Sequence, residues 1–485
     1  MNVFKEDLMI VMMLFLSIEM YGINLTTADL KVPSDGKGLC TVELQHAIDR
    51  IAEGGGGRLT FTPGYYLTGC LILRSSVELY LEEGATLLGS TDPRHYRHNE
   101  LSTSNSNDIS PHALIVARNA EHITLAGKGT IDGQGLQLAL TIDSLHHTGE
   151  LIDPDYNVRR HRPNTRPKLI SFHECRDIRI DGLHLQNSAG WGLSFECCER
   201  LSLSYLNVLN RAYWNNDGID VTDCQHVLIN NCMVNSADDG ICLKSNDANR
   251  CNYDVEISHC FIRSSASAVK FGTASWGGFR KIYVHDLKIR DTFRSCIAIE
   301  SVDGGIIDSV LVEHIDADNT GNAIFMRLGR RFGNRHGSLR HVIIRNLTCR
   351  VPFGRPDEAY DLRGPEVDFF HNPFPSSICG IPGNDIEDVV IEDIDISYPG
   401  RATKGMAYVP LWRLDSVPEE IDKYPEFTMF GELPSWGFYV RHVRRIKFRN
   451  VHLSLRDSDF RPPFVFDNVE QITMEQVTPD SPVFH

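Results

Sequence analysis

Apolar residues in this chain follow a short motif that recurs along most of its length: two alternating apolar positions, two intervening residues, and two more alternating apolar positions. Alternation with period two, in short runs rich in Val and Ile and broken by Asn, Asp and Gly, predicts strand, turn and strand. We find no helical pattern between the repeats. The apolar sets are Ile178/Ile180/Leu183/Leu185, Leu201/Leu203/Leu206/Val208, Val227/Ile229/Cys232/Val234, Val255/Ile257/Cys260/Ile262, Ile282/Val284/Leu287/Ile289, Val310/Val312/Ile315/Ala317, Val342/Ile344/Leu347/Cys349, Val389/Ile391/Ile394/Ile396 and Ile446/Phe448/Val451/Leu453.

The spacing of the repeats predicts the fold. Between Ile180 and Val312 the same position steps by 23, 26, 28, 27 and 28 residues, which suits a coil of three short strands and three turns. Parallel stacking places equivalent residues about 4.8 Å apart and buries one side of every strand. We therefore predict an all-β, single-domain right-handed parallel β-helix. A β-propeller is excluded, because its four-stranded blades need about 40 to 45 residues.

A short helix is expected ahead of the repeats, where four apolar residues stand at helical spacing between Leu44 and Ile51. Thr41 is the expected N-cap, and the glycines at 54–57 are the expected stop. This amphipathic helix would cover the open N-terminal end of the β-helix, where exposed strand edges otherwise invite aggregation.

The first residues predict export. Residues 8–16 form an apolar run preceded by Lys5, too short to span a bilayer and similar to the core of a signal peptide. We predict a signal peptide over residues 1–22, a catalytic domain over residues 23–485 with no transmembrane span, and a secreted or periplasmic location.

Composition narrows the possible partners. The formal net charge of −16 argues against nucleic acid, whose binders need a basic face. Six of the 13 cysteines fall at repeat positions that suit small apolar residues, so we expect packed free thiols there. The sequence contains no Cys-x-x-Cys pair of the kind that would indicate a zinc site. We expect neither a metal nor a cofactor. These six cysteines are Cys175, Cys198, Cys224, Cys232, Cys242 and Cys260.

Two successive repeats carry nearly the same short polar segment. Asn216-Asp217-Gly218-Ile219 is followed 22 residues later by Asp238-Asp239-Gly240-Ile241, each where a polar turn enters an apolar strand. In register, these steps would stack three carboxylates on neighbouring coils, as a catalytic site requires. The alternative is structural, because Asn, Asp and Gly also favour turns.

The chain resembles glycoside hydrolase family 28, the polygalacturonases and their relatives. The resemblance runs from the Asp35-Gly36-Lys37 region to Asn187-x-x-x-Trp191, and then covers 215–220 and 238–239. It implies hydrolysis with inversion, in which Asp238 is the general acid and Asp217 with Asp239 holds the nucleophilic water. Inverting chemistry typically separates acid and base by about 6.5–9.5 Å. The implied substrate is a pectic polysaccharide or oligosaccharide.

Strand alternation predicts which side chains face outward near these acids, and it gives a groove lined by polar groups of mixed sign. Where the family carries Gly-His-Gly, this chain has Ala266-Ser267-Ala268, and where the family carries Arg-Ile-Lys it has Ala298-Ile299-Glu300. Other cations are candidates to bind a sugar carboxylate, although Lys270 could merely pair with Glu300. The candidate substrate-binding residues are Asn215, Lys244, Lys270, Arg294, Glu300 and Arg327.

Three insertions break the repeat. Residues 136–168 carry Arg159, Arg160, His161, Arg162 and Arg166, which form either a solvated loop or a basic lid. The other two insertions, 353–385 and 397–440 (with Trp412, Trp436 and Tyr439), could close one end of the groove and favour cleavage at chain ends.

We therefore expect an inverting glycoside hydrolase that cleaves α-linked galacturonic acid, or a neighbouring residue such as rhamnose, in pectin-type polysaccharide. One alternative is a polysaccharide lyase on the same fold, with Ca²⁺ or a basic side chain among Lys244, Lys270 and Arg327. Another is a β-helix that binds carbohydrate without cleaving it. The oligomeric state is not predicted.

Overall fold

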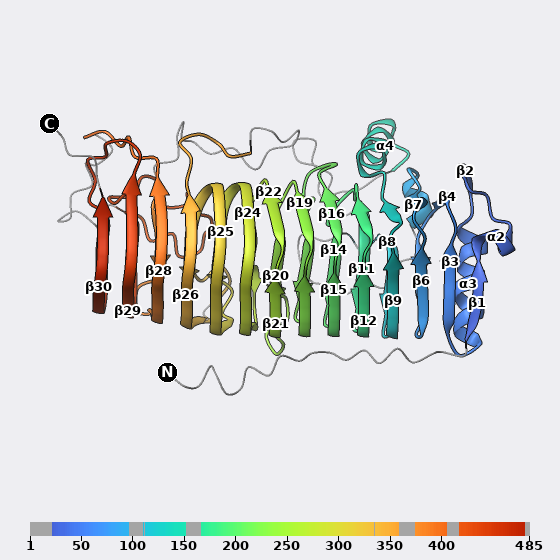
Figure 1. Ribbon diagram of the computed structural model, residues 1–485, viewed down its shortest axis with the longest axis horizontal. Helices are drawn as coiled ribbons and strands as arrows, with labels where there is room; N and C mark the ends of the chain where they lie inside the picture. Colours follow the sequence, from blue (N-terminus) through green and yellow to red (C-terminus); the bar gives the residue numbers. More distant parts are fainter. Residues whose placement is uncertain are drawn as a thin grey trace.

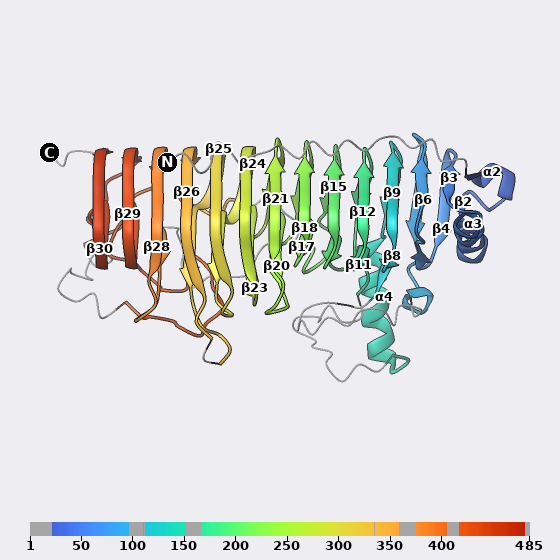
Figure 2. The ribbon, with the colours of Figure 1, turned by 90° about the horizontal axis from the view of Figure 1, so that it is seen from below.

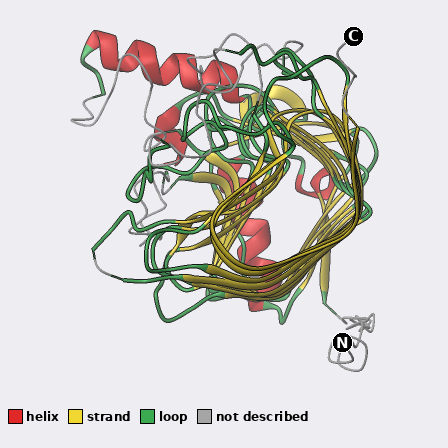
Figure 3. Cartoon of the chain, turned by 90° about the vertical axis from the view of Figure 1, so that its left-hand side faces the viewer, coloured by secondary structure: helices red, strands yellow, loops and turns green. Residues whose placement is uncertain are grey.

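The chain forms an elongated right-handed parallel β-helix, as predicted (Figure 1). The computed structural model describes residues 22–96, 110, 112–151, 166–333, 335–357, 374–404 and 417–480. The coils superimpose along the axis, where strands surround a common interior (Figure 3). Every pairing between named strands is parallel, so equivalent residues of successive coils lie side by side.

Three faces make up each coil. The first face consists of β1 (Ile23–Thr26), β3 (Gly57–Phe61), β6 (Val77–Leu81), β9 (Glu121–Gly127), β12 (Arg176–Asp181), β15 (Glu199–Ser204), β18 (Gln225–Asn230) and β21 (Asn252–Ser258). The second consists of β2 (Asp35–Leu39), β4 (Gly64–Thr68), β7 (Ala85–Gly89), β10 (Thr130–Asp132), β13 (His184–Gln186), β16 (Asn207–Asn210), β19 (Met233–Ser236) and β22 (Phe261–Ser264). The third consists of β5 (Leu71–Ile72), β8 (Ala113–Arg118), β11 (Lys168–His173), β14 (Leu193–Glu196), β17 (Ile219–Thr222), β20 (Ile241–Ser245) and β23 (Val269–Ser275).

Towards the C-terminus the strands run on around the corners of the coil. These longer or later strands are β24 (Gly278–Ser301), β25 (Ile306–Leu328), β26 (Ser338–Arg350), β27 (Ser376–Cys379), β28 (Ile386–Tyr398), β29 (Phe438–Leu455) and β30 (Phe464–Asp480).

The interior is filled by the apolar positions of the repeat. Ile229, Ile257 and Val284 stack in register on three successive coils, and all three are fully buried. One main core runs through the stack. The repeat positions read from the sequence are therefore the core positions, because each coil buries its own inward side chains against those of its neighbours.

Helix α3 (Thr41–Glu53) covers the N-terminal end of the stack, beside β1 and β3, with the short helix α2 (Thr27–Leu30) close by (Figure 1). The expected apolar face is buried and Gly54 ends the helix, as predicted. The expected N-cap is wrong: Cys40 occupies that position. The Thr41 hydroxyl instead accepts a hydrogen bond from the backbone N–H of Gly69, at 2.7 Å, and so ties the cap to the first coils.

The insertion after β10 contains a helix that the sequence analysis did not predict. Helix α4 (Gly135–Thr148) projects from the side of the stack near β8 and β11 (Figure 2). Its buried face is short and comprises Gly135, Leu138, Ala139 and Ile142. So few apolar positions did not stand out from the loop residues on either side. Within the same insertion, Arg159, Arg160, His161 and Arg162 lie outside the described residues.

The cysteine prediction is confirmed. All six cysteines at repeat positions are buried free thiols, and no disulfide joins any of the 13 cysteines. Cys175, Cys198 and Cys224 occupy one column of the stack, where the Cys224 thiol accepts a hydrogen bond from the Cys198 N–H at 3.2 Å. Small sulfur side chains thus fill a narrow corner of the coil.

The predicted signal peptide lies outside the described residues. Among the described residues, no helix combines the length and apolar character that crossing a bilayer requires.

Substitution of one core position tests the stacking. We expect Ile257→Ala to lower the free energy of unfolding by about 2–5 kcal/mol, since the cavity is enclosed by the coils on both sides. Met233→Ala, at a position 55% exposed on the outer surface, should change it by less than about 0.5 kcal/mol. Urea unfolding followed by circular dichroism measures both, and equal effects would contradict the stacked core.

Candidate active site

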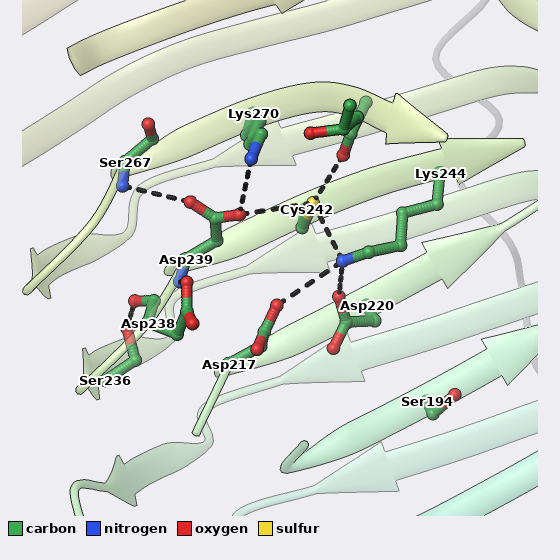
Figure 4. Close-up of polar contacts among 12 residues, drawn as sticks. Ser194, Asp217, Asp220, Ser236, Asp238, Asp239, Cys242, Lys244, Ser267 and Lys270 are labelled. Carbon is green, nitrogen blue, oxygen red and sulfur yellow. Dashed lines mark hydrogen bonds and ion pairs between the residues drawn. The ribbon is translucent and has the colours of Figure 1, made fainter. Parts of the chain in front are cut away.

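Asp217 and Asp239 occupy equivalent positions one coil apart, each two residues before the start of its strand, β17 or β20. The backbone ladder sets this register, because the Gly192 N–H donates to the Asp217 carbonyl and the Gly218 N–H donates to the Asp239 carbonyl, each at 2.9 Å. Asp217, Asp238 and Asp239 each offer a carboxylate oxygen within 4.8 Å of the others (Figure 4). The three predicted catalytic acids therefore meet on the outer side of the third face.

Glycine is required between the acids and their strands. A Cβ atom at Gly218 would lie 2.5 Å from the Gly240 carbonyl oxygen, and one at Gly240 would lie 2.7 Å from the Ala268 carbonyl oxygen. Both distances are far below van der Waals contact. The Asp-Gly steps noted in the sequence thus allow neighbouring coils to approach closely at the point where the acids stand.

Asn216 is a brace rather than a ligand-facing group. Its side chain is fully buried and donates to the carbonyls of Ser188 and Gly190, at 3.0 and 2.6 Å. Its amide oxygen accepts from the Tyr213 N–H at 2.6 Å. These bonds hold the turn that presents Asp217.

Asp239 is held as a carboxylate. Its two oxygens accept hydrogen bonds from the Lys270 ammonium and from the Ser267 N–H, both at 3.0 Å (Figure 4). Burial opposes ionisation, but Lys270 and then Arg294 outweigh it and lower the pKa of Asp239. Asp239 is therefore suited to act as a base.

Asp238 and Asp217 hold protons more strongly. Burial and the neighbouring Asp239 charge raise the pKa of Asp238, whose carboxylate accepts one hydrogen bond within the described residues, from the Asp239 N–H at 3.0 Å. Burial and Asp220 raise the pKa of Asp217, although Lys244 lies 3.4 Å away. The pKa values of these crowded acids are thus shifted in opposite directions, an arrangement that suits acid–base catalysis.

Asp220 is a part of this site to which the sequence analysis assigned no role. It is fully buried beneath Asp217 and forms an ion pair with Lys244, whose ammonium also lies 3.1 Å from the Cys242 thiol. Burial raises the pKa of Asp220 to about 6. Its position opposite Cys242 in the strand register could have identified it, because both follow a candidate catalytic aspartate by three residues.

Among the predicted substrate-binding residues, Lys244 and Lys270 lie beside the acids, and both ammonium groups are already paired with aspartates. Arg294 is nearby and pairs with Glu426 at 3.1 Å. Lys270 also donates to the Tyr424 hydroxyl at 3.0 Å, so the segment that begins at residue 417 reaches the site. Tyr424 was not singled out in the sequence because no repeat pattern surrounds it.

The other three candidates lie differently. Arg327 is buried away from the acids, where it donates to the carbonyls of Gly380, Glu419 and Glu420. The Asn215 side chain accepts from Arg166 at 3.0 Å. Glu300 is buried on the coils beyond Lys270 and makes no ion pair with it within the described residues. Their roles in substrate binding remain predictions.

Loop residues cover the outer side of the later coils, which carries the buried charged side chains of Glu300 and Arg327 as well as apolar ones. Ala298 and Phe325 lie on this side, where they form a second core with residues of the covering loops. Trp436 packs into the main core, and Trp412 lies outside the described residues. The second core contains Ala298, Phe325, Phe374, Cys379, Val417, Phe427, Phe430, Leu433, Tyr439 and Val465.

Two groups of side chains within the described residues are close enough to share a cation. One is the acid cluster, where Lys244 and Lys270 already supply positive charge. The other, at an outer corner, comprises His259, His285 and Asp286. The His285 Nδ1–H donates to the Asp286 carboxylate at 2.6 Å, which accounts for this group as an ion pair.

A parallel β-helix with a cluster of carboxylic acids on one outer face is the arrangement expected of an enzyme that cleaves polysaccharides. Residues 97–325 match the family model "Glycosyl hydrolases family 28". This match covers just under half of the chain, which over these residues is similar to the glycoside hydrolases of that family.

Relatives agree with this assignment. A probable polygalacturonase of Vitis vinifera is 25% identical over 75% of this chain and 67% of its own length. A probable polygalacturonase of Arabidopsis thaliana is 24% identical over 42% of this chain and 43% of its own length, so this chain spans less than half of that relative. The family 28 exopolygalacturonase of Yersinia enterocolitica has the same fold, with a TM-score of 0.65, 17% identity, and coverage of 93% of this chain and 78% of its own.

The ionisation of Glu300 should make the free energy of unfolding depend on pH. Burial raises its pKa from 4.5 to about 7, although Lys270 opposes the shift. The folded state therefore binds this proton more tightly than the unfolded state, and the stability from this group is lost as pH rises from about 4.5 to about 7. Glu300→Gln, which imitates the protonated form, should lose less stability than the wild type between pH 5 and pH 8.

Urea unfolding at both pH values measures this difference. The control Glu53→Gln, at the exposed end of α3, should follow the wild type. A Glu300→Gln profile parallel to that of the wild type would show that Glu300 is ionised at pH 5.

Proposed function

We propose that this chain hydrolyses α-linked galacturonic acid in pectin-type polysaccharide, with inversion at the anomeric carbon and release from a chain end. The observation that carries the proposal is the convergence of Asp217, Asp238 and Asp239 within 4.8 Å on one outer face. The family and the polygalacturonase relatives support the choice of a pectic substrate.

The roles follow from the electrostatics. Asp238 is the more exposed acid and holds its proton, so it protonates the leaving oxygen. Asp239 is ionised and shares a column with Asp217, so these two orient the attacking water. Lys270 and Ser267 keep Asp239 in place while the proton moves.

The spacing of the acids is shorter than the 6.5–9.5 Å that typically separates acid and base in inverting enzymes. A water molecule that forms a hydrogen bond of about 2.8 Å to each of two oxygens can bridge a separation of up to about 5.6 Å between them. A water molecule therefore fits between oxygens that lie within 4.8 Å of one another. The proposal of inversion rests on the similarity to the family and not on this spacing, and the configuration of the product decides it.

The covered later coils favour action at chain ends. The second core fills the outer face from Ala298 onward, and Arg327 is held there by backbone carbonyls. The segment that covers this face also contacts the site, through Tyr424 on Lys270 and Glu426 on Arg294. A polysaccharide bound at the acids would therefore end at this wall.

The lyase alternative requires a basic group that can take a proton near neutral pH. The neighbouring acids raise the pKa of both Lys244 and Lys270, despite burial, which makes each a poor base. Arg327 lies away from the acids. The alternative of a non-catalytic carbohydrate-binding β-helix does not account for three acids of divided ionisation on one face.

Replacement of the proposed general acid tests the catalytic role. We expect Asp238→Asn to lower the turnover of galacturonan at least a hundredfold, as typical general-acid contributions of about 10²–10⁴ imply. Asp395→Asn, in an exposed aspartate on a distant coil, should leave turnover unchanged. Reducing-sugar release measures both, and full activity in Asp238→Asn would refute the assignment.

Product analysis tests the reaction itself. Proton NMR during hydrolysis of a galacturonan oligomer should show a β-configured product first, and chromatography should show only mono- or disaccharides at early times. The proposed reaction would be contradicted by retention of configuration, by an unsaturated product that absorbs in the ultraviolet, or by release of rhamnose alone. Early products of many lengths would contradict cleavage at chain ends.

A further inference from the structure

Lys168 stands in the same column of the β-helix as the catalytic acids. Ile170, Leu193, Ile219, Ile241 and Val269 pair in register on five successive coils. The residues two positions before them therefore also form a column. That column contains, in order, Lys168, Trp191, Asp217, Asp239 and Ser267.

The Lys168 ammonium lies on the outer side of the third face. It donates to the Ser194 hydroxyl at 3.3 Å, and Ser194 pairs in register with Asp220 of the site. Figure 4 shows Ser194 on the strand beside that of Asp220. The Trp191 ring lies between two cations, with the Lys168 and Lys244 nitrogens 5.3 and 4.2 Å from its centre.

Lys168 differs from the other cations of this face because no carboxylate within the described residues forms an ion pair with it. Lys244 pairs with Asp220 and Asp217, Lys270 pairs with Asp239, and Arg294 pairs with Glu426. Lys168 is only 5% exposed. A buried ammonium without a counter-ion is unfavourable, so its environment is incomplete as it stands.

The electrostatics agree with this geometry. Burial lowers the pKa of Lys168 to about 8, and the more distant charges of Glu196 and Asp220 oppose the shift without cancelling it. An anion bound next to the ammonium would supply the missing charge. A carboxylate is suited to this, because it accepts hydrogen bonds from both the ammonium and a neighbouring hydroxyl.

We propose that Lys168 and Ser194 bind the carboxylate of a uronic acid residue, in a subsite beside Trp191 and two coils from Asp217. Two coils correspond to about 10 Å along the axis, so this sugar is a neighbour of the one that is cleaved. The proposal rests on the proposed function and deepens it, because the enzyme would recognise a free carboxylate on a sugar away from the scissile bond. A methyl-esterified sugar at this position lacks the required charge.

Paired substrates and a charge-conserving variant test the subsite. On galacturonan oligomers with free carboxylates, Lys168→Met should lower kcat/KM about tenfold to a hundredfold, mainly through a higher KM, as loss of a charge-assisted hydrogen bond implies. Lys168→Arg should retain most of the activity. On methyl-esterified oligomers of equal length, the wild type and Lys168→Met should be alike.

Lys128→Met is the matched control, since Lys128 is exposed on a turn away from the site. It should leave both substrates unaffected. Thermal unfolding distinguishes misfolding from a lost subsite: Lys168→Met should unfold no lower than the wild type, because it removes a buried unpaired charge. Equal losses of kcat/KM on both substrates, or no loss on either, would overturn the proposal.

Binding without turnover separates this proposal from the proposed function. In the Asp238→Asn background, calorimetry should detect a free-acid galacturonan oligomer, and Lys168→Met should weaken that binding. Binding that depends on Lys168, in a wild-type enzyme that does not hydrolyse galacturonan, would uphold the subsite and reject the reaction. Hydrolysis that is insensitive to Lys168 would reject the subsite alone.

Discussion

The register of the parallel backbone ladder is the constraint on which the rest of this structure depends. Each coil fixes the next one residue by residue, so side chains some 22 to 28 positions apart in the chain become neighbours. The interior uses this to stack aliphatic side chains, as at Ile229, Ile257 and Val284. The outer face uses the same ladder to stack Asp217 on Asp239. A slip of one residue would exchange the two sides and destroy both the core and the site.

Charge at the site is balanced locally rather than by solvent. Asp217, Asp220 and Asp239 are nearly or fully buried, and Lys244 and Lys270 are buried beside them. Like charges in a poorly solvated cluster cannot all remain ionised, and each lysine favours ionisation of the acid that it contacts. Lys270, with Arg294, lowers the pKa of Asp239, whereas burial outweighs Lys244 and raises the pKa of Asp217 and Asp220.

The loops outside the coils decide how much of the outer face a polysaccharide can reach. The segment from Val417 to Leu433 packs onto Ala298 and Phe325 and places Tyr424 and Glu426 against cations of the site. On the opposite side of the acids the column continues through Trp191 to Lys168. The site is thus bounded by an apolar wall in one direction and, in the other, by Lys168, which forms no ion pair among the described residues.

The sequence alone determined the coil and the position of the three acids along it, because a fixed repeat converts spacing in the chain into contact in space. The capping helix and the packed cysteines follow from the same local patterns. It did not determine which cations remain available to a ligand. Lys270 and Arg294 are taken up by Asp239 and Glu426, Arg327 is enclosed by backbone carbonyls, and Asp220 joins the site through Lys244. These pairings depend on side-chain reach and on loops without a repeat, so only the tertiary structure decides them.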